Sequence, residues 1–263
     1  MFSYSILYRM NPVQAVILGL VEGITEFLPI SSTAHIIITA KILGIAQTTS
    51  TGFFEIFIQA GAILAALLLF YKMIFTHKHL VEQIIYSFVP TALLGIFAHK
   101  YIKTFFFQSM PAIGFSLIIA SIIFIIVEGG IRNNKIKLDK TIKELTHQDA
   151  LIIGAAQAIA LFPGVSRAGA VIVTMLILGY NRKEATIYSF ILAIPTIFAA
   201  ALFDLVKTKD ALGSSDLLPI TIGFVTSFIS AYVVIKLFIS FIQKHTLVPF
   251  ALYRMILAIP LLA

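Results

Sequence analysis

Two carboxylates, three consecutive hydroxyls and a histidine occur within fourteen residues near the start of the chain, at 22–35. Glu22 and Glu26 are four residues apart, so on a helix they share one face, where they could hold a divalent cation or do acid and base chemistry. His35 follows Ser32 by about one helical turn, a spacing that suits a nucleophile and its base. Because the flanking residues are almost wholly apolar, these groups are expected to face a cavity or another polar group.

Pro29 lies inside this motif and should end a helix at about that point. Ser31 or Ser32 could then cap a second helix that carries His35. Irregular backbone between two helices is tolerated at membrane depth where it lines a cavity. We therefore predict two half-helices separated by a break that presents Ser31, Ser32 and Thr33 to a ligand.

A second break, at 162–170, has the sequence Phe-Pro-Gly-Val-Ser-Arg-Ala-Gly-Ala. Gly164 allows close backbone approach, and Ser166 can cap the following half-helix, whose first amides point at an anion. Arg167 adds a cation with a forked donor face suited to phosphate. The alternative is that Arg167 only neutralises one of the two carboxylates.

Other polar residues in the apolar segments could also have functional or structural roles. Arg254 is either a second phosphate ligand or an arginine that snorkels to the membrane interface. Glu55 and Gln59 repeat the four-residue spacing and could form a supporting polar shell. The carboxylate pair of the first motif could also be structural, hydrogen-bonded in the core with a raised pKa.

Composition indicates an all-α polytopic membrane protein. Of 263 residues, 59% are apolar and only 12% are charged, and the mean hydropathy is +1.01. A soluble domain of this length would need far more charged surface. The net charge of +7 comes mainly from lysines and arginines at the ends of apolar runs, which favours lipid headgroups over nucleic acid as partners. The absence of cysteine excludes disulfides and thiolate chemistry. The N-terminus does not resemble a cleavable signal peptide.

Ten apolar segments follow one another, and a full span needs about 20 residues. Four segments are too short and form two pairs, each broken by proline and by small or hydroxyl residues. We predict two re-entrant half-helix pairs and six transmembrane helices, the segment at 84–98 being the shortest of the six. The pairs are 13–30 with 33–45 and 150–163 with 168–179, and the six spans are 53–71, 84–98, 111–127, 188–206, 217–242 and 247–263.

The two broken pairs are related in sequence. A shift of 135 residues aligns 14–44 with 149–179 without a gap, and 11 of the 31 positions are identical, where apolar bias alone would give roughly three. Three spans per half is an odd number, so the halves should enter the membrane from opposite sides as an inverted-topology repeat. We expect one membrane domain over 1–263, with repeat 1 at about 12–130, a linker at 131–148 and repeat 2 at about 149–263.

The distribution of basic residues predicts the orientation. With the linker in the cytoplasm, that side also holds Lys72, Lys78, Arg182, Lys183 and Lys244. The far side then holds Arg9, Lys41, Lys100, Lys103, Lys207 and Lys209. The excess favours a cytoplasmic linker and external termini.

These motifs resemble those of a known family. The run from Glu22 to His35 and the run Pro163-Gly164-Val165-Ser166-Arg167 are similar to the two signatures of the bacterial undecaprenyl-pyrophosphate phosphatase (bacitracin-resistance) family. The similarity extends essentially from end to end, and its further segments are Phe54-Glu55, Ile58-Gln59, Ser189-Phe190, Ile194-Pro195 and the run 249–254.

The resemblance implies an integral inner-membrane enzyme that removes one phosphate from a C55 isoprenyl diphosphate and so recycles the lipid carrier for peptidoglycan. It also implies an outward-opening (periplasmic) site and a divalent cation, Mg²⁺ or Ca²⁺, at Glu22 and Glu26. We expect isoprenyl diphosphate and membrane lipids as partners, and a homodimer stays open. The expected catalytic residues are Glu22, Glu26, Ser32, His35 and Arg167, and the expected substrate-binding residues are Ser31, Thr33, Gly164, Ser166 and Arg254.

Two questions stay open at this point. The nucleophile is Ser32 with His35 as its base, His35 itself, or an activated water. The rival function is a polyprenyl-phosphate transporter, which would use the same inverted-repeat site. The chain also departs from the family, because Ala168 and Val171 replace two hydroxyls of the expected phosphate cradle and Ala34 replaces a glycine.

Overall fold

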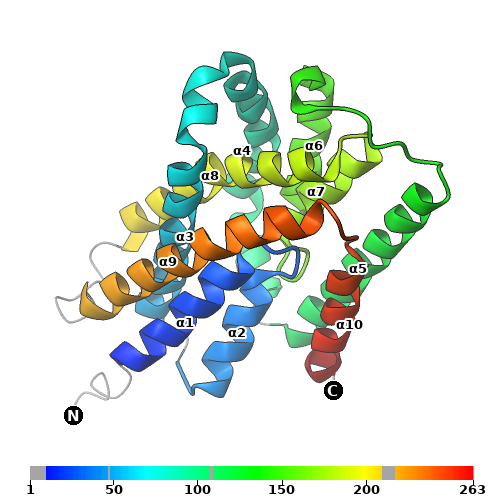
Figure 1. Cartoon of the computed structure of the whole chain (residues 1–263). Coiled ribbons are helices and arrows are strands. Elements are labelled where there is room, and N and C mark those ends of the chain that lie inside the picture. The colour runs from blue at the N-terminus through cyan, green and yellow to red at the C-terminus, as the bar shows by residue number, and fades with distance from the viewer. Residues whose placement is uncertain (1–9, 47, 107–108, 209–216, 263) are drawn as a thin grey trace, which may run out of the picture.

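The computed structural model describes residues 10–46, 48–106, 109–208 and 217–262 (Figure 1). Within these ranges the chain forms ten α-helices and one 3₁₀ helix, η2 (Ile142–Glu144), with one isolated β-bridge and no β-strand. Helices satisfy their own backbone groups, as a bilayer requires. The α-helices are α1 (Pro12–Thr25), α2 (Ser32–Ile42), α3 (Thr49–Thr76), α4 (Lys78–Phe105), α5 (Met110–Arg132), α6 (His147–Ile159), α7 (Arg167–Ile177), α8 (Arg182–Thr208), α9 (Leu217–Ile242) and α10 (Val248–Leu262).

Five helices are long and apolar enough to cross a membrane, so the chain is a polytopic α-helical membrane protein. The crossing segments are Ser50–Thr76, Lys78–Ala98, Met110–Arg132, Arg182–Phe203 and Leu217–Ile242. The shortest predicted span, 84–98, therefore lies within a longer helix than expected. The sixth predicted span, 247–263, corresponds to α10, which has 15 residues and is shorter than the roughly 20 that a full span needs. Six spans thus remain a prediction.

Each predicted break separates two short helices at matching positions. α2 (Ser32–Ile42) and α7 (Arg167–Ile177) begin and end 135 residues apart, as the sequence alignment requires. The residues that precede them, Ser31 and Ser166, have φ angles of 70° and 75°. Such left-handed backbone costs roughly 1–2 kcal/mol for a residue other than glycine. The surroundings of both breaks therefore hold the chain in an unfavourable conformation.

Local sequence explains where the half-helices begin and end. Asn11 caps α1 through a capping box with Gln14, in which each side chain accepts from the other's backbone N–H. α1 ends at Thr25, four residues before Pro29 and earlier than the proline alone predicts, so that Glu26 is the C-cap of the helix. Thr146 caps α6 through a single hydrogen bond, its hydroxyl oxygen accepting from the backbone N–H of Asp149 at 3.1 Å.

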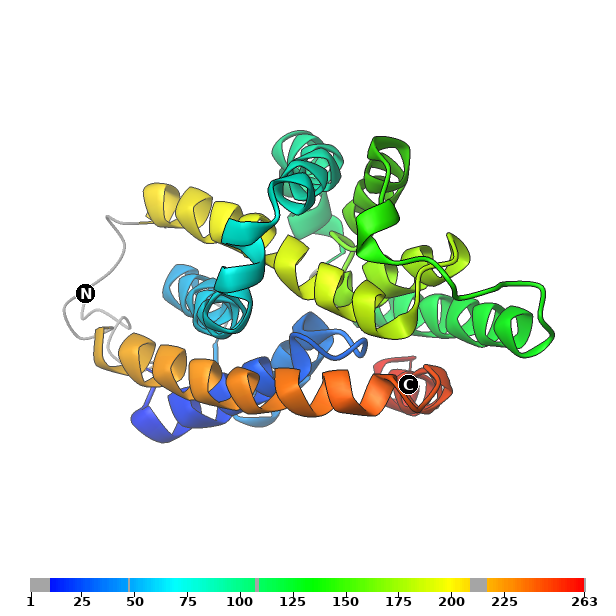
Figure 2. The ribbon, with the colours of Figure 1, turned by 45° about the horizontal axis from the view of Figure 1, so that its top comes forward.

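The first half of the chain is interlaced with the second. α1 packs along α9, and α6 packs along α4 (Figures 1 and 2). Glycines make both contacts close. A methyl group at Gly23 would lie 2.0 Å from Ser230 Oγ, and one at Gly154 would lie 2.2 Å from the backbone oxygen of Ser87. Only glycine permits these backbones to approach so closely.

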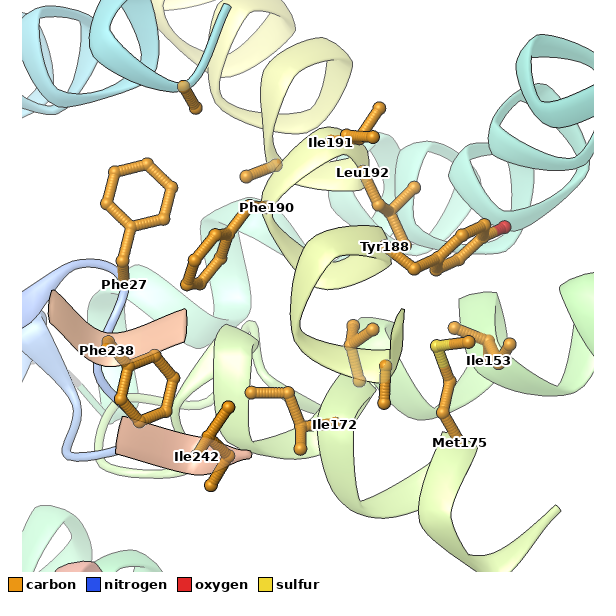
Figure 3. Close-up of a cluster of buried hydrophobic side chains, with 14 of the residues drawn as sticks. Phe27, Ile153, Ile172, Met175, Tyr188, Phe190, Ile191, Leu192, Phe238 and Ile242 are labelled. Atoms are coloured by element: carbon orange, nitrogen blue, oxygen red, sulfur yellow. The ribbon is translucent and has the colours of Figure 1, made fainter. Parts of the chain in front are cut away.

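The largest apolar core extends from α8 to the first break (Figure 3). Phe27 is fully buried in it, with its ring edge-on to that of Phe190 at a centroid distance of 4.8 Å. Phe238 of α9 also packs near the Phe190 ring, with the centroids 6.1 Å apart. Because Phe27 directly follows Glu26, burial of this ring fixes the direction of the neighbouring carboxylate.

The predicted linker is ordered rather than free. The backbone N–H of Lys140 donates to the carbonyl oxygen of Gly179, between α7 and α8, at 3.0 Å, and the backbone N–H of Ile142 donates to Glu184 at the start of α8. Hydrogen bonds from the backbone and side chain of Thr141 hold the pKa of Glu144 below its ordinary value. The first two contacts fasten the linker to α8 and to the turn that precedes it.

A buried ion pair joins α5, α8 and the connection between α9 and α10. Arg182 at the start of α8 makes two hydrogen bonds of 2.5 Å to Glu128 of α5. Glu128 also accepts from the backbone N–H of Leu247, between α9 and α10, at 2.7 Å. Breaking such a pair would leave an uncompensated buried charge, which costs about 3–5 kcal/mol.

Candidate active site

Glu26 lies where the two breaks meet and contacts residues from both. The Ser32 hydroxyl donates a hydrogen bond of 2.5 Å to Glu26 Oε2. Arg167 Nη2 donates to the other oxygen, Oε1, at 3.1 Å, and Arg167 Nη1 donates to the backbone oxygen of Ser189 at 2.9 Å. The side chains of Arg167 and Glu26 are only 12% and 6% exposed. Three of the predicted catalytic residues are therefore in direct contact.

Glu22 lies beside this trio, fully buried on α1. Neither of its carboxylate oxygens has a hydrogen-bond partner among the described residues. Its charge interacts with those of Glu26, Glu55 and Arg167. A buried carboxylate without a partner is costly, so Glu22 has capacity for a proton, a cation or a substrate group.

His35 makes its hydrogen bonds away from Ser32. Its Nδ1 is 2.8 Å from the backbone oxygen of Ser31, and its Nε2 is 2.7 Å from the hydroxyl of Tyr253. The structure therefore gives the Ser32 hydroxyl a carboxylate as its partner, in place of the imidazole that we predicted as its base. Glu26 occupies the position from which a base can accept the serine proton.

Arg254 ties the two breaks together through their backbone. Its guanidinium donates to the carbonyl oxygens of Pro29 at 3.1 Å, Val165 at 3.0 Å and Gly164 at 2.9 Å. The side chain is fully buried, so the prediction of a snorkelling arginine is wrong. Three of its five donors are used by the chain itself, which makes Arg254 a clamp on the site; a phosphate contact stays a prediction.

The other predicted substrate-binding residues lie at the two breaks. Ser166 is buried and its Oγ accepts from the backbone of Gly169 at 3.2 Å, which leaves the hydroxyl proton available to a ligand. Gly164 has a φ of 96°, and a methyl group there would lie 2.6 Å from the backbone oxygen of Ile113, so glycine is required. Ser31 is buried, and Thr33 is half-buried in the first turn of α2.

The positions where the chain departs from the family are packed inside the protein. Ala34, Ala168 and Val171 are all fully buried, and Val171 belongs to the largest apolar core. A hydroxyl at 171 would therefore enter an apolar environment, and our expectation that this position lines the phosphate cradle has no support from its packing.

Sequence reasoning missed Tyr253. This residue precedes Arg254 on α10, and its contact with His35 joins positions 218 residues apart. No local pattern signals such a contact. It depends on how α10 lies against α2, which Ala34, Ala258 and Leu261 bring together in a small apolar cluster with α5.

The carboxylates partly fit the predicted divalent cation. Among the described residues, no group of three or more histidine, cysteine, aspartate or glutamate side chains could hold a metal ion. The two unpartnered oxygens of Glu22 are hard ligands next to a second carboxylate, and Mg²⁺ completes such partial sites with water and substrate phosphate. The residues are therefore compatible with a cation that a diphosphate shares.

Comparison with known proteins gives a consistent result over almost the whole chain. The family model described as bacitracin resistance protein BacA matches residues 15–260. A protein of Campylobacter fetus named undecaprenyl-diphosphatase is 44% identical over 94% of this chain and 96% of its own length. Proteins with the same name from a Sulfurihydrogenibium species and from Aquifex aeolicus are each 42% identical, over 95% and 94% of this chain and 98% and 95% of their own lengths. The chain belongs to the bacitracin resistance protein BacA family.

Proposed function

We propose that this chain is a membrane phosphatase that hydrolyses undecaprenyl diphosphate to undecaprenyl phosphate and phosphate. The observation that carries the proposal is the buried contact of Glu26 with Ser32 on one side and Arg167 on the other. This contact unites a hydroxyl, a base and a phosphate-binding cation inside a membrane protein. The family and its named relatives identify the lipid substrate.

In the mechanism that this geometry favours, Ser32 is the nucleophile and Glu26 is its base. Ser32 Oγ attacks the terminal phosphorus and its proton passes to Glu26. The bond from that phosphorus to the bridging oxygen breaks, undecaprenyl phosphate leaves and a phosphoserine remains. Water then attacks the phosphoserine, releases phosphate and returns Ser32 to its hydroxyl form as Glu26 gives the proton back.

Arg167 would stabilise charge on the transferring phosphoryl group. Its planar guanidinium matches two phosphate oxygens, and in a buried site such a contact is much stronger than in water. Ser166 and the first backbone amides of α7 lie at the N-terminus of that helix. A helix N-terminus favours an anion, so these donors would contact the phosphate. Together these donors would hold the group through the transfer.

Labelled substrate distinguishes the three candidate nucleophiles. An acid-stable phosphoserine supports Ser32, and an acid-labile phosphohistidine supports His35 acting directly. The absence of any adduct under single-turnover conditions supports an activated water. We expect the phosphoserine, because Ser32 is the residue whose hydroxyl contacts a carboxylate.

We also propose that Glu22 and Glu26 hold a divalent cation, Mg²⁺ or Ca²⁺. Two carboxylates and a diphosphate carry far more negative charge than Arg167 and Arg254 together balance. When bound, the ion would neutralise charge on the diphosphate. Glu22, with its two unpartnered oxygens, would be the principal protein ligand.

For the architecture we propose an inverted-topology repeat of six spans and two re-entrant pairs, with repeat 1 at about 12–130, a linker at 131–148 and repeat 2 at about 149–263. Equal helix bounds at an offset of 135 support the repeat, as do the equivalent φ angles of Ser31 and Ser166. The reciprocal packing of α1 on α9 and α6 on α4 also supports it.

We place the protein in the bacterial inner membrane with its site open to the periplasm, as the charge distribution and the family suggest. Of the basic residues on which this orientation rests, Arg9 and Lys209 lie outside the described residues. The isoprenyl tail would remain in the bilayer, where lipid-facing side chains are apolar. A homodimer is the association we would test for.

Phosphate release by the purified protein in detergent tests the function. Detergent removes the second compartment, so a transporter would produce no signal while a phosphatase would turn over. The matched control is Ser32→Ala, which retains the fold and loses the attacking oxygen. The transporter alternative has no support from the relatives, and only a wild-type protein without turnover would revive it.

A further inference from the structure

The two ring nitrogens of His35 are both occupied. Nδ1 is 2.8 Å from the backbone oxygen of Ser31, and Nε2 is 2.7 Å from the hydroxyl of Tyr253. A backbone oxygen can only accept a hydrogen bond, so Nδ1 carries a proton. In the neutral imidazole Nε2 is then the acceptor, and the Tyr253 hydroxyl must be its donor.

This arrangement determines which nitrogen can do chemistry. Nδ1 remains bound to the backbone of its own helix, four residues back, whatever the charge of the ring. Nε2 is the only atom of His35 that can accept a proton from a reacting group or contact a phosphate oxygen. Access to that atom is therefore controlled by Tyr253.

Tyr253 is well placed to orient His35. The two ring planes are within 5° of parallel, with centroids 5.6 Å apart, and the hydroxyl meets Nε2 at 2.7 Å, so the rings lie side by side and the hydrogen bond fixes the direction of the imidazole as well as its tautomer. The side chain is 44% exposed, whereas Arg254, the next residue, is fully buried and holds the backbone of both breaks. The tyrosine thus lies on a helix that is firmly attached to the site.

We propose that Tyr253 is a positioning residue for His35. Its hydroxyl remains the donor to Nε2 when substrate binds, and so holds the neutral imidazole in one tautomer and one orientation beside the lipid diphosphate. This inference rests on the proposed phosphatase function, and it adds Tyr253 to a site to which α10 already contributes Arg254.

The chain contains its own reference histidine. His245 has the same backbone contact, with Nδ1 2.9 Å from the carbonyl oxygen of Phe241 four residues earlier. Its ring lies parallel to that of Phe241, with the centroids 4.1 Å apart. Among the described residues no tyrosine hydroxyl contacts its Nε2. His245 therefore lacks the tyrosine hydrogen bond that His35 has.

Diethyl pyrocarbonate, which modifies unprotonated imidazole nitrogen, reports on Nε2 without requiring turnover. We would follow the modification of His35 and His245 by peptide mass spectrometry in wild type, Tyr253→Phe and Tyr232→Phe. The last variant makes the same chemical change at a tyrosine that contacts Lys236 on α9. A hydrogen bond of about 0.5–1.5 kcal/mol corresponds to roughly a two- to tenfold change. Tyr253→Phe should accelerate modification of His35 by that factor, with His245 unchanged, and Tyr232→Phe should alter neither.

Kinetics of the same variants show whether Tyr253 orients His35 for turnover or only shields its Nε2 from the reagent. Tyr253→Phe should lower kcat for phosphate release by a similar factor and leave KM nearly unchanged, because the orientation of His35 is lost while the diphosphate contacts remain. Equal modification rates in wild type and Tyr253→Phe would overturn the contact. Faster modification with an unchanged kcat would overturn the positioning role. A wild-type protein that releases no phosphate would overturn the function itself, and the modification ratio would still show whether the contact exists.

Discussion

At the scale of single residues, Glu26 has two partners that make opposite demands on it. Arg167 stabilises its ionised form, and Ser32 requires it to accept a proton. Glu26→Gln retains the size of the side chain but can neither take that proton nor balance the guanidinium. We expect kcat for phosphate release to fall by about 10²- to 10⁴-fold, the usual contribution of a general base.

The result for Glu26→Gln is interpretable only if the protein still folds. Thermal unfolding in detergent, together with retention of the Arg167 contacts to Ser189, would show this. A variant that folds and retains wild-type turnover would remove Glu26 from the mechanism and return the base role to His35.

Glu22→Gln should have a different outcome because Glu22 has no hydrogen bond to lose. Replacing a buried carboxylate by a neutral amide removes a desolvation cost, so the thermal midpoint should stay the same or rise. Activity should nevertheless be lost, since an amide is a poor ligand for a hard cation. Titration with Mg²⁺ and Ca²⁺ tests this expectation. A wild-type rate at saturating ion would mean that the carboxylates are structural.

For Arg167 the shape of the cation should matter more than its charge. Arg167→Lys should be nearly as damaging to kcat/KM as Arg167→Ala, because lysine cannot make the two-point contact with phosphate or reach Glu26 and Ser189 together. Steady-state kinetics of the two variants provide the measurement. Wild-type behaviour of the lysine variant would leave Arg167 with a purely electrostatic role.

At the scale of elements, the seam between α1 and α9 positions Glu22. Gly23→Ala would drive a methyl group to 2.0 Å from Ser230 Oγ and 2.4 Å from the backbone oxygen of Ser227. Relief requires the two helices to separate, and overpacking of this kind costs about 1–3 kcal/mol. We expect a lower thermal midpoint and reduced turnover.

The matched control for the seam is Gly95→Ala. Gly95 is also in the interior of a helix, α4, but a methyl group there meets nothing within 4 Å. This change should be neutral or stabilising by up to about 1 kcal/mol, the helix-propensity gain of alanine. If both variants have the same thermal midpoint, α1 and α9 can move apart to admit the methyl group at little energetic cost.

The elements that the sequence predicted well are those governed by local chemistry. Proline, glycine and serine mark the two breaks, and the offset of 135 aligns the ends of α2 and α7. The roles of Arg254 and Tyr253 were beyond prediction, because both depend on side chains that reach across more than 200 residues of sequence. The pairing of Ser32 with Glu26 instead of His35 is similarly a matter of how the backbone turns at Ser31, where φ is 70°. No residue type dictates that turn.

At the scale of the whole molecule, the absence of cysteine allows the proposed orientation to be tested cleanly. Asn133→Cys places a thiol on the exposed start of the linker, and Lys41→Cys places one on the exposed end of α2. In spheroplasts, a membrane-impermeant maleimide should label the cysteine at 41 directly and the one at 133 only after permeabilisation. The reverse pattern would invert the topology and place the site on the cytoplasmic side.

The packing of α1 against α9 has a consequence for how the protein is made. A ribosome releases Pro12–Thr25 early, but the helix that covers it, Leu217–Ile242, emerges only after most of the chain. During that interval Glu22 lacks its neighbours from the second half of the chain and is not yet buried. The first segment of the site to be synthesised is thus among the last to be completed. A nascent chain stalled before residue 217 should contain an α1 that proteases and water can still reach.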